Sequence, residues 1–265
     1  MIRRYAVGLE YDGTHYAGWQ RQLFFAATIQ EQVDCALSRV AAAEIASICA
    51  GRTDAGVHAT MQVIHFDTDA QRSDFAWLAG TNRYLPSDIR LQWISMVDEH
   101  FHARYSARAR QYRYLIRHRS QPSALWAKRC YWHRKSLDSN IMHAAAQVLV
   151  GEHDFSAFRA AECQAKTAWR CIHRIDVRER HGWIAVDISG NAFLHHMVRN
   201  IVGTLLAVGD KRYPPEWVES VLHSRNRCMA GVTAPAQGLY LCGVTYPPEF
   251  LLPHNSSAWI PDVFI

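Results

Sequence analysis

The sequence predicts an α+β fold in two lobes, and three observations lead to this prediction. Segments with alternating apolar residues, typical of strands with one buried face, occur in both halves of the chain. Segments with apolar residues three or four positions apart, typical of amphipathic helices, lie between them. The second half repeats the order of elements in the first half, but not its residues. A chain of 265 residues is long enough for two small domains, which we expect at 1–106 and 107–248, followed by a tail at 249–265.

The first half begins with a strand and a helix. Residues 5–11 alternate, with tyrosines and aliphatic residues on one parity, which predicts a strand with one buried face. Residues 28–44 have apolar side chains at helical spacing, and Thr28 is a suitable N-cap, so we expect a helix of about four turns. Residues 62–68 predict another strand. The intervening segment 51–59, GRTDAGVHA, is therefore expected to be a loop at the mouth of a sheet.

The second half follows the same general order. We expect a strand at 110–117, a helix near 138–150, a strand at 183–189, a long helix from about 192 and a closing strand at 238–246. The apolar stripe of the long helix leaves four residues on one flank: His195, His196, Arg199 and Gly203. A guanidinium buried there without a partner would be costly, so we expect a carboxylate from elsewhere in the chain, and Asp54 is the natural candidate.

The segment that joins the two halves is rich in arginine and tyrosine. Residues 102–120 contain six arginines, three tyrosines and no acidic residue, although the whole chain has an excess of only 29 − 24 = 5 basic over acidic residues. One interpretation is a solvated edge strand, since charges protect sheet edges. We favour nucleic-acid binding, because arginines suit phosphates and tyrosines suit the unstacked bases of single-stranded or flipped RNA.

Several other classes of protein are disfavoured. The seven cysteines are scattered, with no C-x-x-C pair, which favours reduced thiols over a disulfide framework or a zinc site. No apolar run reaches the ~18 residues of a membrane span, and the start, MIRRYAVGLEYD, lacks the apolar core of a signal peptide. Neither common phosphate-binding glycine loop is present. We therefore expect a cytoplasmic protein without a nucleotide cofactor.

Asp54 has three possible roles on the residues alone. It could be a turn residue between two glycines that supply positive φ. It could bind a metal together with His58, but no third ligand at suitable spacing is evident. It could also be a functional carboxylate paired with Arg199.

Seven collinear motifs distinguish these possibilities: EYDGTHYAGWQ (10–20), GRTDAGVHATMQVIHF (51–66), LPSDI (85–89), FHARYSARARQYRY (101–114), GEHDFSAF (151–158), GNAFLHHMVRNIVGTLL (190–206) and APAQGLYL (234–241). Together they resemble the TruA family of tRNA pseudouridine synthases over residues 5 to 246. The resemblance implies isomerisation of uridine to pseudouridine at tRNA positions 38, 39 and 40, in the anticodon stem-loop, without a cofactor or metal. It also implies a homodimer. Each subunit is expected to have two ferredoxin-like or RRM-like domains, whose antiparallel strands form one continuous central sheet flanked by helices, with the active-site cleft between the domains.

The resemblance also implies roles for individual residues. Asp54 matches the catalytic aspartate, Tyr112 the tyrosine that packs on the target base, and Arg199 the basic partner of the aspartate. Leu239 matches an apolar wall of the pocket, and Arg52 an arginine that fills the space left by the flipped base. His58, Arg108 and Arg110 are further candidates for substrate binding.

The chemistry suits these residue types. Breaking the bond from N1 to C1′, rotating the uracil and rejoining it through C5 changes no oxidation state. A single carboxylate can serve either as the nucleophile or as a base at C2′, and the sequence leaves both possibilities open. Pairing with Arg199 would keep the carboxylate ionised, and an aromatic platform would offset part of the cost of unstacking the base.

One segment departs from the family pattern. The stretch after GWQRQ reads LFFAATIQ, where the family usually has a polar loop near the RNA, so Phe24 and Phe25 could form a partner patch, form a dimer contact or be buried. The alternative function is a non-catalytic tRNA-binding protein on the same fold.

Overall fold

The computed structural model describes residues 2–22 and 27–253, so the Phe24–Phe25 segment and most of the tail lie outside the described residues. The described chain divides into two compact units. Unit 1 comprises residues 2–110 and 241–253, and unit 2 comprises residues 111–240. Strands β5 (Ala109–His118) and β10 (Leu239–Thr245) each run from one unit into the other. The domain boundaries given above stay a prediction.

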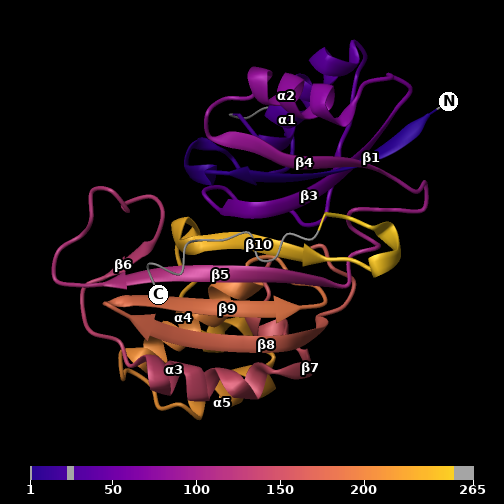
Figure 1. Cartoon of the computed structure of the whole chain (residues 1–265). Coiled ribbons are helices and arrows are strands. Elements are labelled where there is room, and N and C mark those ends of the chain that lie inside the picture. Colours follow the sequence, from indigo (N-terminus) through magenta and orange to yellow (C-terminus); the bar gives the residue numbers. More distant parts are fainter. Residues whose placement is uncertain (1, 23–26, 254–265) are drawn as a thin grey trace. The chain divides into compact units, whose positions relative to one another are not determined.

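Unit 1 is a sheet with two helices (Figure 1). Its elements are β1 (Arg3–Tyr11), α1 (Ile29–Ala41), β2 (Ile48–Cys49), β3 (His58–Thr68), α2 (Asp74–Tyr84) and β4 (Ile89–Val97). The strand order is β4-β1-β3-β10, with β2 beside β3, and β1 pairs antiparallel with both β3 and β4. Rings of Tyr5, Phe66 and Trp77 pack together and join β1, β3 and α2 in the core.

The first strand is buried on both faces, whereas one buried face was predicted. Tyr5, Val7, Leu9 and Tyr11 are buried as expected. Ala6, on the other face, is also buried, in a cluster that includes Phe101 and is covered by residues near the end of the described chain, among them Tyr246 and Phe250. At Gly8 an added Cβ would lie 2.1 Å from the Trp93 indole nitrogen, so small residues on this face admit large neighbours.

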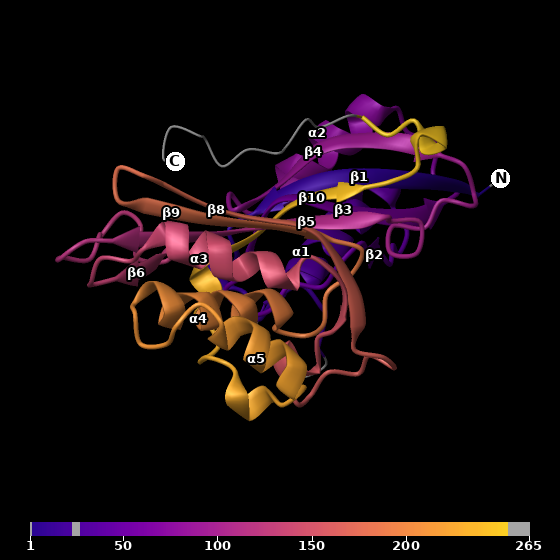
Figure 2. The same cartoon turned by 90° about the horizontal axis from the view of Figure 1, so that it is seen from below.

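Unit 2 holds the other strands of the sheet, with three helices on one face (Figure 2). Its elements, besides β5, are β6 (Tyr131–His133), α3 (Ser139–Ala146), β7 (Gly151–Asp154), β8 (Trp169–Arg180), β9 (Trp183–Gly190), α4 (Met197–Gly209) and α5 (Trp217–Ser224). The strand order is β5-β9-β8-β7, with β6 parallel to β5. Short 3₁₀ helices lie at Gly13–His15, Gln147–Leu149, Ser156–Phe158, Arg227–Met229, Ala236–Gly238 and Pro248–Phe250.

The starts of two helices, α1 and α4, test the sequence-based predictions, and one of the two predictions is wrong. Helix α1 begins after Thr28, whose hydroxyl accepts from Glu31 N at 3.4 Å, as predicted. The long helix begins at Met197, so the predicted start at about 192 is wrong. Asn191 Oδ1 accepts from the backbone nitrogens of Ala192 and Cys171, which ties the segment before the helix to β8 in a turn and competes with helix formation.

The predicted fold class is confirmed at the level of an α+β protein with a large sheet flanked by helices. The strands expected at 110–117 and 183–189 correspond to β5 and β9. No helix of the described residues is long and apolar enough to cross a membrane. The ferredoxin-like architecture of each domain and the cleft between domains stay predictions.

Candidate active site

The GRTD segment lies in a loop between β2 and β3, as predicted, and β3 begins at His58. Thr53 is buried, Asp54 is half-buried and Arg52 is exposed. Asp54 O accepts from Val57 N at 3.1 Å, and Gly56 has a φ of 77°, so the chain turns immediately after Asp54. The backbone of Asp54 therefore does take part in a turn, as one interpretation of the sequence proposed.

Gly18 holds this loop from one side. It has a φ of 94°, and an added Cβ would lie 2.6 Å from Thr53 O. The next residue, Trp19, donates its backbone N–H to the same oxygen at 3.0 Å. The hydroxyls of Tyr11 and Thr53 are hydrogen-bonded at 2.8 Å. Because only a glycine allows this approach, the segment GWQ sets the position of the residue that precedes Asp54.

Gly13 and His58 hold the other end of the loop. An added Cβ on Gly13 would lie 2.0 Å from Val57 O. His58 is 2% exposed, and its Nδ1 lies 3.1 Å from both Asp12 Oδ1 and Gly13 N. The hydrogen bond from His58 holds the pKa of Asp12 well below its usual range. His58 thus packs beneath the loop, and its predicted contact with the substrate stays a prediction.

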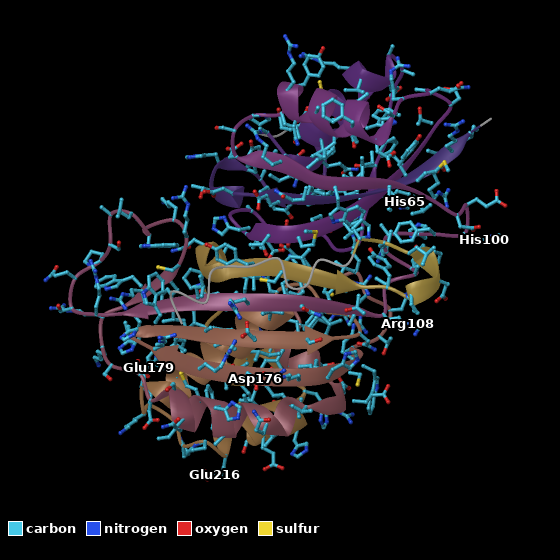
Figure 3. The ribbon with its side chains drawn as sticks, viewed as in Figure 1. His65, His100, Arg108, Asp176, Glu179 and Glu216 are labelled. Atoms are coloured by element: carbon cyan, nitrogen blue, oxygen red, sulfur yellow. The ribbon has the colours of Figure 1, made fainter. Side chains whose placement is uncertain are left out.

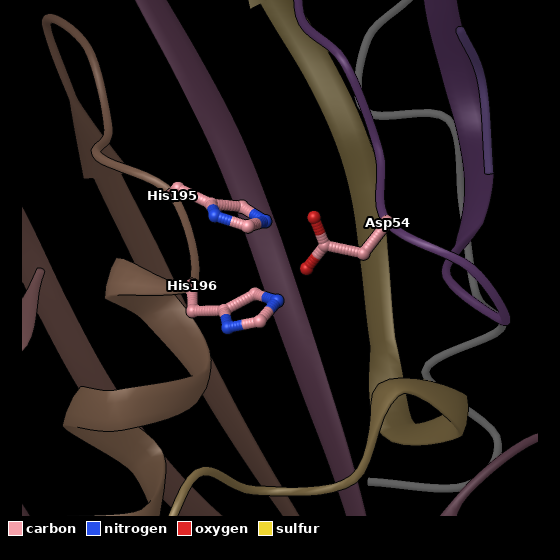
Figure 4. A group of neighbouring side chains, drawn as sticks. All are labelled: Asp54, His195 and His196. Carbon is pink, nitrogen blue, oxygen red and sulfur yellow. The ribbon is translucent and has the colours of Figure 1, made fainter. Parts of the chain in front are cut away.

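In unit 2, two histidines precede α4. The rings of His195 and His196 lie 4.0 Å apart between centroids, and His196 has a left-handed backbone with a φ of 60°. His196 O accepts from Asn200 N at 2.9 Å, which starts the helix. Figure 4 shows these two side chains and that of Asp54, which comes from the loop of unit 1. His195 and His196 were predicted on a helical flank, but they lie in the turn before the helix.

Arg199 lies in the first turn of α4 and is half-buried. Its Nε donates to Ala234 O at 2.8 Å, and its own carbonyl accepts from Ala234 N at 3.1 Å. The base of the guanidinium is therefore held by the segment that leads into β10. The predicted ion pair between Arg199 and Asp54 stays a prediction.

Asn200 connects three segments of unit 2. It is 0% exposed, and its Nδ2 donates to Phe158 O at 2.8 Å. Its Oδ1 accepts from Thr233 Oγ1 at 2.7 Å and from Arg227 Nη2 at 3.1 Å. Since Thr204 Oγ1 also donates to Asn200 O, the residue that follows Arg199 in α4 is the centre of a buried polar hub. At Gly203 an added Cβ would lie 1.7 Å from Val232 O, so this glycine lets the segment pack against the helix.

Tyr112 and Leu239 are both buried in unit 2. Tyr112 is 9% exposed, and its ring meets that of Phe193 edge to face, with centroids 5.0 Å apart. Leu239 is 5% exposed and begins β10, after a 3₁₀ turn in which Gly238 packs against Tyr114. Both side chains are therefore largely shielded from solvent.

Arg108 and Arg110 differ in their surroundings. Arg108 is exposed. Arg110 is 9% exposed, and its guanidinium donates to the carbonyls of Ala50, Arg104 and Ala107 at 3.0, 2.6 and 3.2 Å. Arg110 therefore ties the residue before the GRTD loop to the strand β5. Its predicted contact with RNA stays a prediction.

The family described as tRNA pseudouridine synthase matches residues 9–106 and 145–247, which is well over half of the chain. The chain belongs to this family. The resemblance inferred from the seven motifs is thereby confirmed. A protein of Aeromonas hydrophila named tRNA pseudouridine synthase A is 52% identical over 98% of this chain and 97% of its own length. Proteins of the same name from Histophilus somni and Shewanella piezotolerans are 52% and 53% identical, each over 94% of this chain and over 93% and 95% of their own lengths.

Sequence reasoning missed the residues that position this site. Gly18, Gly13 and Asp12 belong to a motif that pointed to the family, but nothing in the sequence showed that they contact the GRTD loop. Asn200 stood beside Arg199 in MVRN, and the rarity of an uncompensated asparagine in an apolar helix stripe was the signal that could have identified it.

Proposed function

We propose that this protein is an isomerase that converts uridine to pseudouridine in tRNA, at positions 38, 39 and 40 of the anticodon stem-loop. The observation that carries the proposal is the 52% identity, over nearly the whole chain, to a protein named tRNA pseudouridine synthase A. The loop with Asp54 supports it, because a carboxylate on a turn held at both ends suits a catalytic group.

The reaction needs no cofactor. The N1–C1′ bond breaks, the uracil rotates, a C5–C1′ bond forms, and the proton on C5 moves to solvent while N1 gains one. Atoms and electrons balance within the nucleotide. We assign Asp54 to the ribose, either as a nucleophile or as a base at C2′, and in both cases it must be ionised.

The other proposed roles follow from position and chemistry. Tyr112 and Leu239 would form the apolar walls around the flipped uracil, and burial of both side chains supports this. Arg199 would pair with Asp54 and keep it charged, and its attachment to Ala234 supports a fixed guanidinium. Arg52 would occupy the space that the flipped base leaves in the RNA.

Arg108, Arg110 and His58 complete the proposed substrate-binding set. Exposure of Arg108 supports a phosphate contact. For Arg110 and His58, burial beside the GRTD loop favours an indirect role, in which they hold the loop that meets the RNA. We also propose that the protein acts as a homodimer in the cytoplasm, where its seven free cysteines would remain reduced.

The experiment is to incubate the purified protein with a tRNA transcript, without added cofactor or metal, and to map pseudouridine by carbodiimide modification. We expect modification in the anticodon stem-loop with the parent protein. Asp54→Asn should abolish it and leave tRNA affinity within about tenfold, because only catalysis needs the charged carboxylate. Asp69→Asn, at an exposed site of the same unit, is the control and should keep full activity.

Two results would refute the proposal. Near-normal turnover in Asp54→Asn would remove Asp54 from the chemistry. Tight tRNA binding without modification of any transcript would make the protein a tRNA-binding protein rather than an enzyme.

A further inference from the structure

Tyr105 is 76% exposed, although several hydrogen bonds hold the loop that carries it. His102 Nδ1 accepts from the backbone nitrogens of Arg104 and Tyr105, at 3.1 and 3.2 Å. His102 N donates to Ser106 Oγ at 3.0 Å, and Ser106 N donates to His102 O at 2.9 Å. The turn from 102 to 106 is therefore closed by its own hydrogen bonds.

The same turn is anchored to the interior of unit 1. Ala103 is 0% exposed, its N–H donates to His65 Nδ1 at 3.1 Å, and its carbonyl accepts from the Tyr246 hydroxyl at 2.6 Å. Arg104 O accepts from Arg110 Nη2 at 2.6 Å. These bonds tie the backbone of the turn to unit 1 on both sides of Ala103, so they fix the main chain that carries Tyr105.

A row of rings leads from the core to Tyr105. The ring of His65, which is buried, lies 4.6 Å from that of His102, and the ring of His102 lies 4.3 Å from that of Tyr105, tilted by 31°. The Arg104 guanidinium lies 5.6 Å from the Tyr105 centroid. Burial, together with neighbouring cationic groups, lowers the pKa of His65 to about 4 and also lowers the pKa of His102. Both shifts favour the neutral imidazole, and the ring that lies against the tyrosine is that of His102.

We propose that Tyr105 is a stacking platform for an unpaired base of the substrate RNA, with Arg104 and Arg108 attracting the adjoining phosphates. This rests on the proposed function, because it takes tRNA as the ligand. A base fits better than an apolar protein surface, because the residues beside the ring are cationic: Arg104 and Arg108 are exposed, and Figure 3 marks Arg108. A rigid aromatic face next to arginines is the arrangement that binds single-stranded nucleic acid, and it tolerates any base sequence.

The first test measures tRNA affinity at several salt concentrations. Tyr105→Ala should weaken binding by about 5- to 150-fold, the range for loss of one stacked base, and should leave the slope of log affinity against log salt unchanged because a stacked base releases no counterions. Tyr105→Phe keeps the ring and should bind within about threefold of the parent. Phe75→Ala, at an aromatic residue that is 79% exposed on α2, is the matched control and should bind like the parent.

A second test locates the contact directly. Ultraviolet cross-linking of the parent protein to tRNA, followed by trypsin, should leave a nucleotide on the peptide 105–108, and Tyr105→Ala should lose it. Parental affinity in Tyr105→Ala, or no cross-link on this peptide, would overturn the proposal. A change of sedimentation in Tyr105→Ala without RNA would also overturn it, because the ring would then belong to an interface between copies of the chain.

The outcome separates this inference from the proposed function. If tRNA binding depends on Tyr105 but no pseudouridine forms, the platform stands and the enzymatic assignment fails. If pseudouridine forms equally well with Tyr105→Ala at limiting tRNA, the enzymatic assignment stands and the platform fails.

Discussion

The two segments that carry the proposed catalytic residues are held in different ways. In unit 1, the GRTD loop is positioned by close approach of main chain to main chain, at Gly13 and Gly18. In unit 2, the segment behind Arg199 is positioned by buried side-chain hydrogen bonds that meet at Asn200. The first arrangement leaves no room for a single added carbon, and the second depends on every polar atom keeping its partner. The main chain is therefore positioned by steric exclusion in one unit and by buried hydrogen bonds in the other.

Gly18→Ala should have the largest effect on activity. The new Cβ would lie 2.6 Å from Thr53 O, so the loop must shift and carry Asp54 with it. A misplacement of about 1 Å can cost roughly 100-fold in rate, and we expect a loss of this order in single-turnover pseudouridine formation at saturating tRNA.

Gly151→Ala is the control, because it introduces backbone strain at a positive φ without a steric clash. Gly151 has a φ of 107°, but its added Cβ would lie no closer than 3.5 Å to His153 Nε2. We expect about 1–2 kcal/mol of destabilisation in thermal unfolding and an unchanged turnover. Parental turnover in Gly18→Ala would show that the close approach does not position the loop.

Asn200→Ala should have the next largest effect, mainly through stability. It takes the buried acceptor from the Thr233 hydroxyl and the amide donor from Phe158 O, and each lost partner costs about 1–3 kcal/mol. Turnover of the folded fraction should fall about tenfold, because the neighbouring Arg199 loses its rigid support. Asn226→Ala, at an exposed 3₁₀ cap, should cost about 1 kcal/mol and keep turnover, as measured by urea unfolding and single-turnover assays. Equal losses of stability in Asn200→Ala and Asn226→Ala would contradict the proposed role of Asn200 as the centre of the hub.

The sequence predicted the periodic elements and the chemical identities, but not these supports. Helix α1 could be predicted because its apolar residues recur at helical spacing, and strands β3, β5 and β9 because they are rich in β-branched and aromatic residues. The start of α4 could not, because Leu194 is buried in the turn just as it would be in a helix. The second buried face of β1 could not, because Ala6 and Gly8 are too small to stand out as core residues.

The candidate site shows the same limit. Asp54 and Arg199 were identified through motifs, which record residue types in order. The contact between Gly18 and Thr53 joins positions 35 residues apart, and a single sequence contains no signal for such a pairing. The hub at Asn200 likewise depends on Thr233 and Phe158, which come from separate motifs or from none.

Dependence on pH distinguishes the two units in another way, because the hub residues of unit 2 are amide, hydroxyl and guanidinium groups, whereas α1 of unit 1 buries a carboxyl group. In unit 1, burial raises the pKa of Asp34 to about 6, against the partly opposing hydrogen bonds from Ser47. The folded protein thus binds this proton more tightly than the unfolded chain. The stability from Asp34 is complete below the unfolded pKa of 3.8 and is lost as the pH rises through about 6.

Asp34→Asn should remove this loss, because the amide oxygen can still accept from Ser47. We expect the variant to gain up to about 3 kcal/mol over the parent above pH 6 and little at pH 4, measured by urea unfolding across pH. Asp12→Asn is the control of opposite sign. Because the hydrogen bond from His58 lowers the pKa of Asp12, its stability is present at neutral pH and lost in acid, so this variant should be weaker than the parent at pH 7. The same pH profile for both variants would contradict the assignment.

The smallest expected effect is on tRNA binding, and it distinguishes Arg108 from Arg110, which the sequence alone does not. Arg108 is exposed, whereas Arg110 donates to three carbonyls, one of them just before the GRTD loop. Arg108→Ala should weaken tRNA binding a few-fold at physiological salt and reduce the slope of log affinity against log salt by about 0.7 to 0.9, as expected for one lost phosphate contact. Arg110→Ala should instead lower the midpoint of unfolding. It should leave the salt-dependence slope unchanged, because the Arg110 guanidinium binds carbonyl groups of the protein and not a phosphate. If the slope changed in Arg110→Ala and not in Arg108→Ala, the buried arginine would have to reach the RNA by leaving its carbonyls, and the loop before Asp54 would then be held less firmly in the complex than in the free protein.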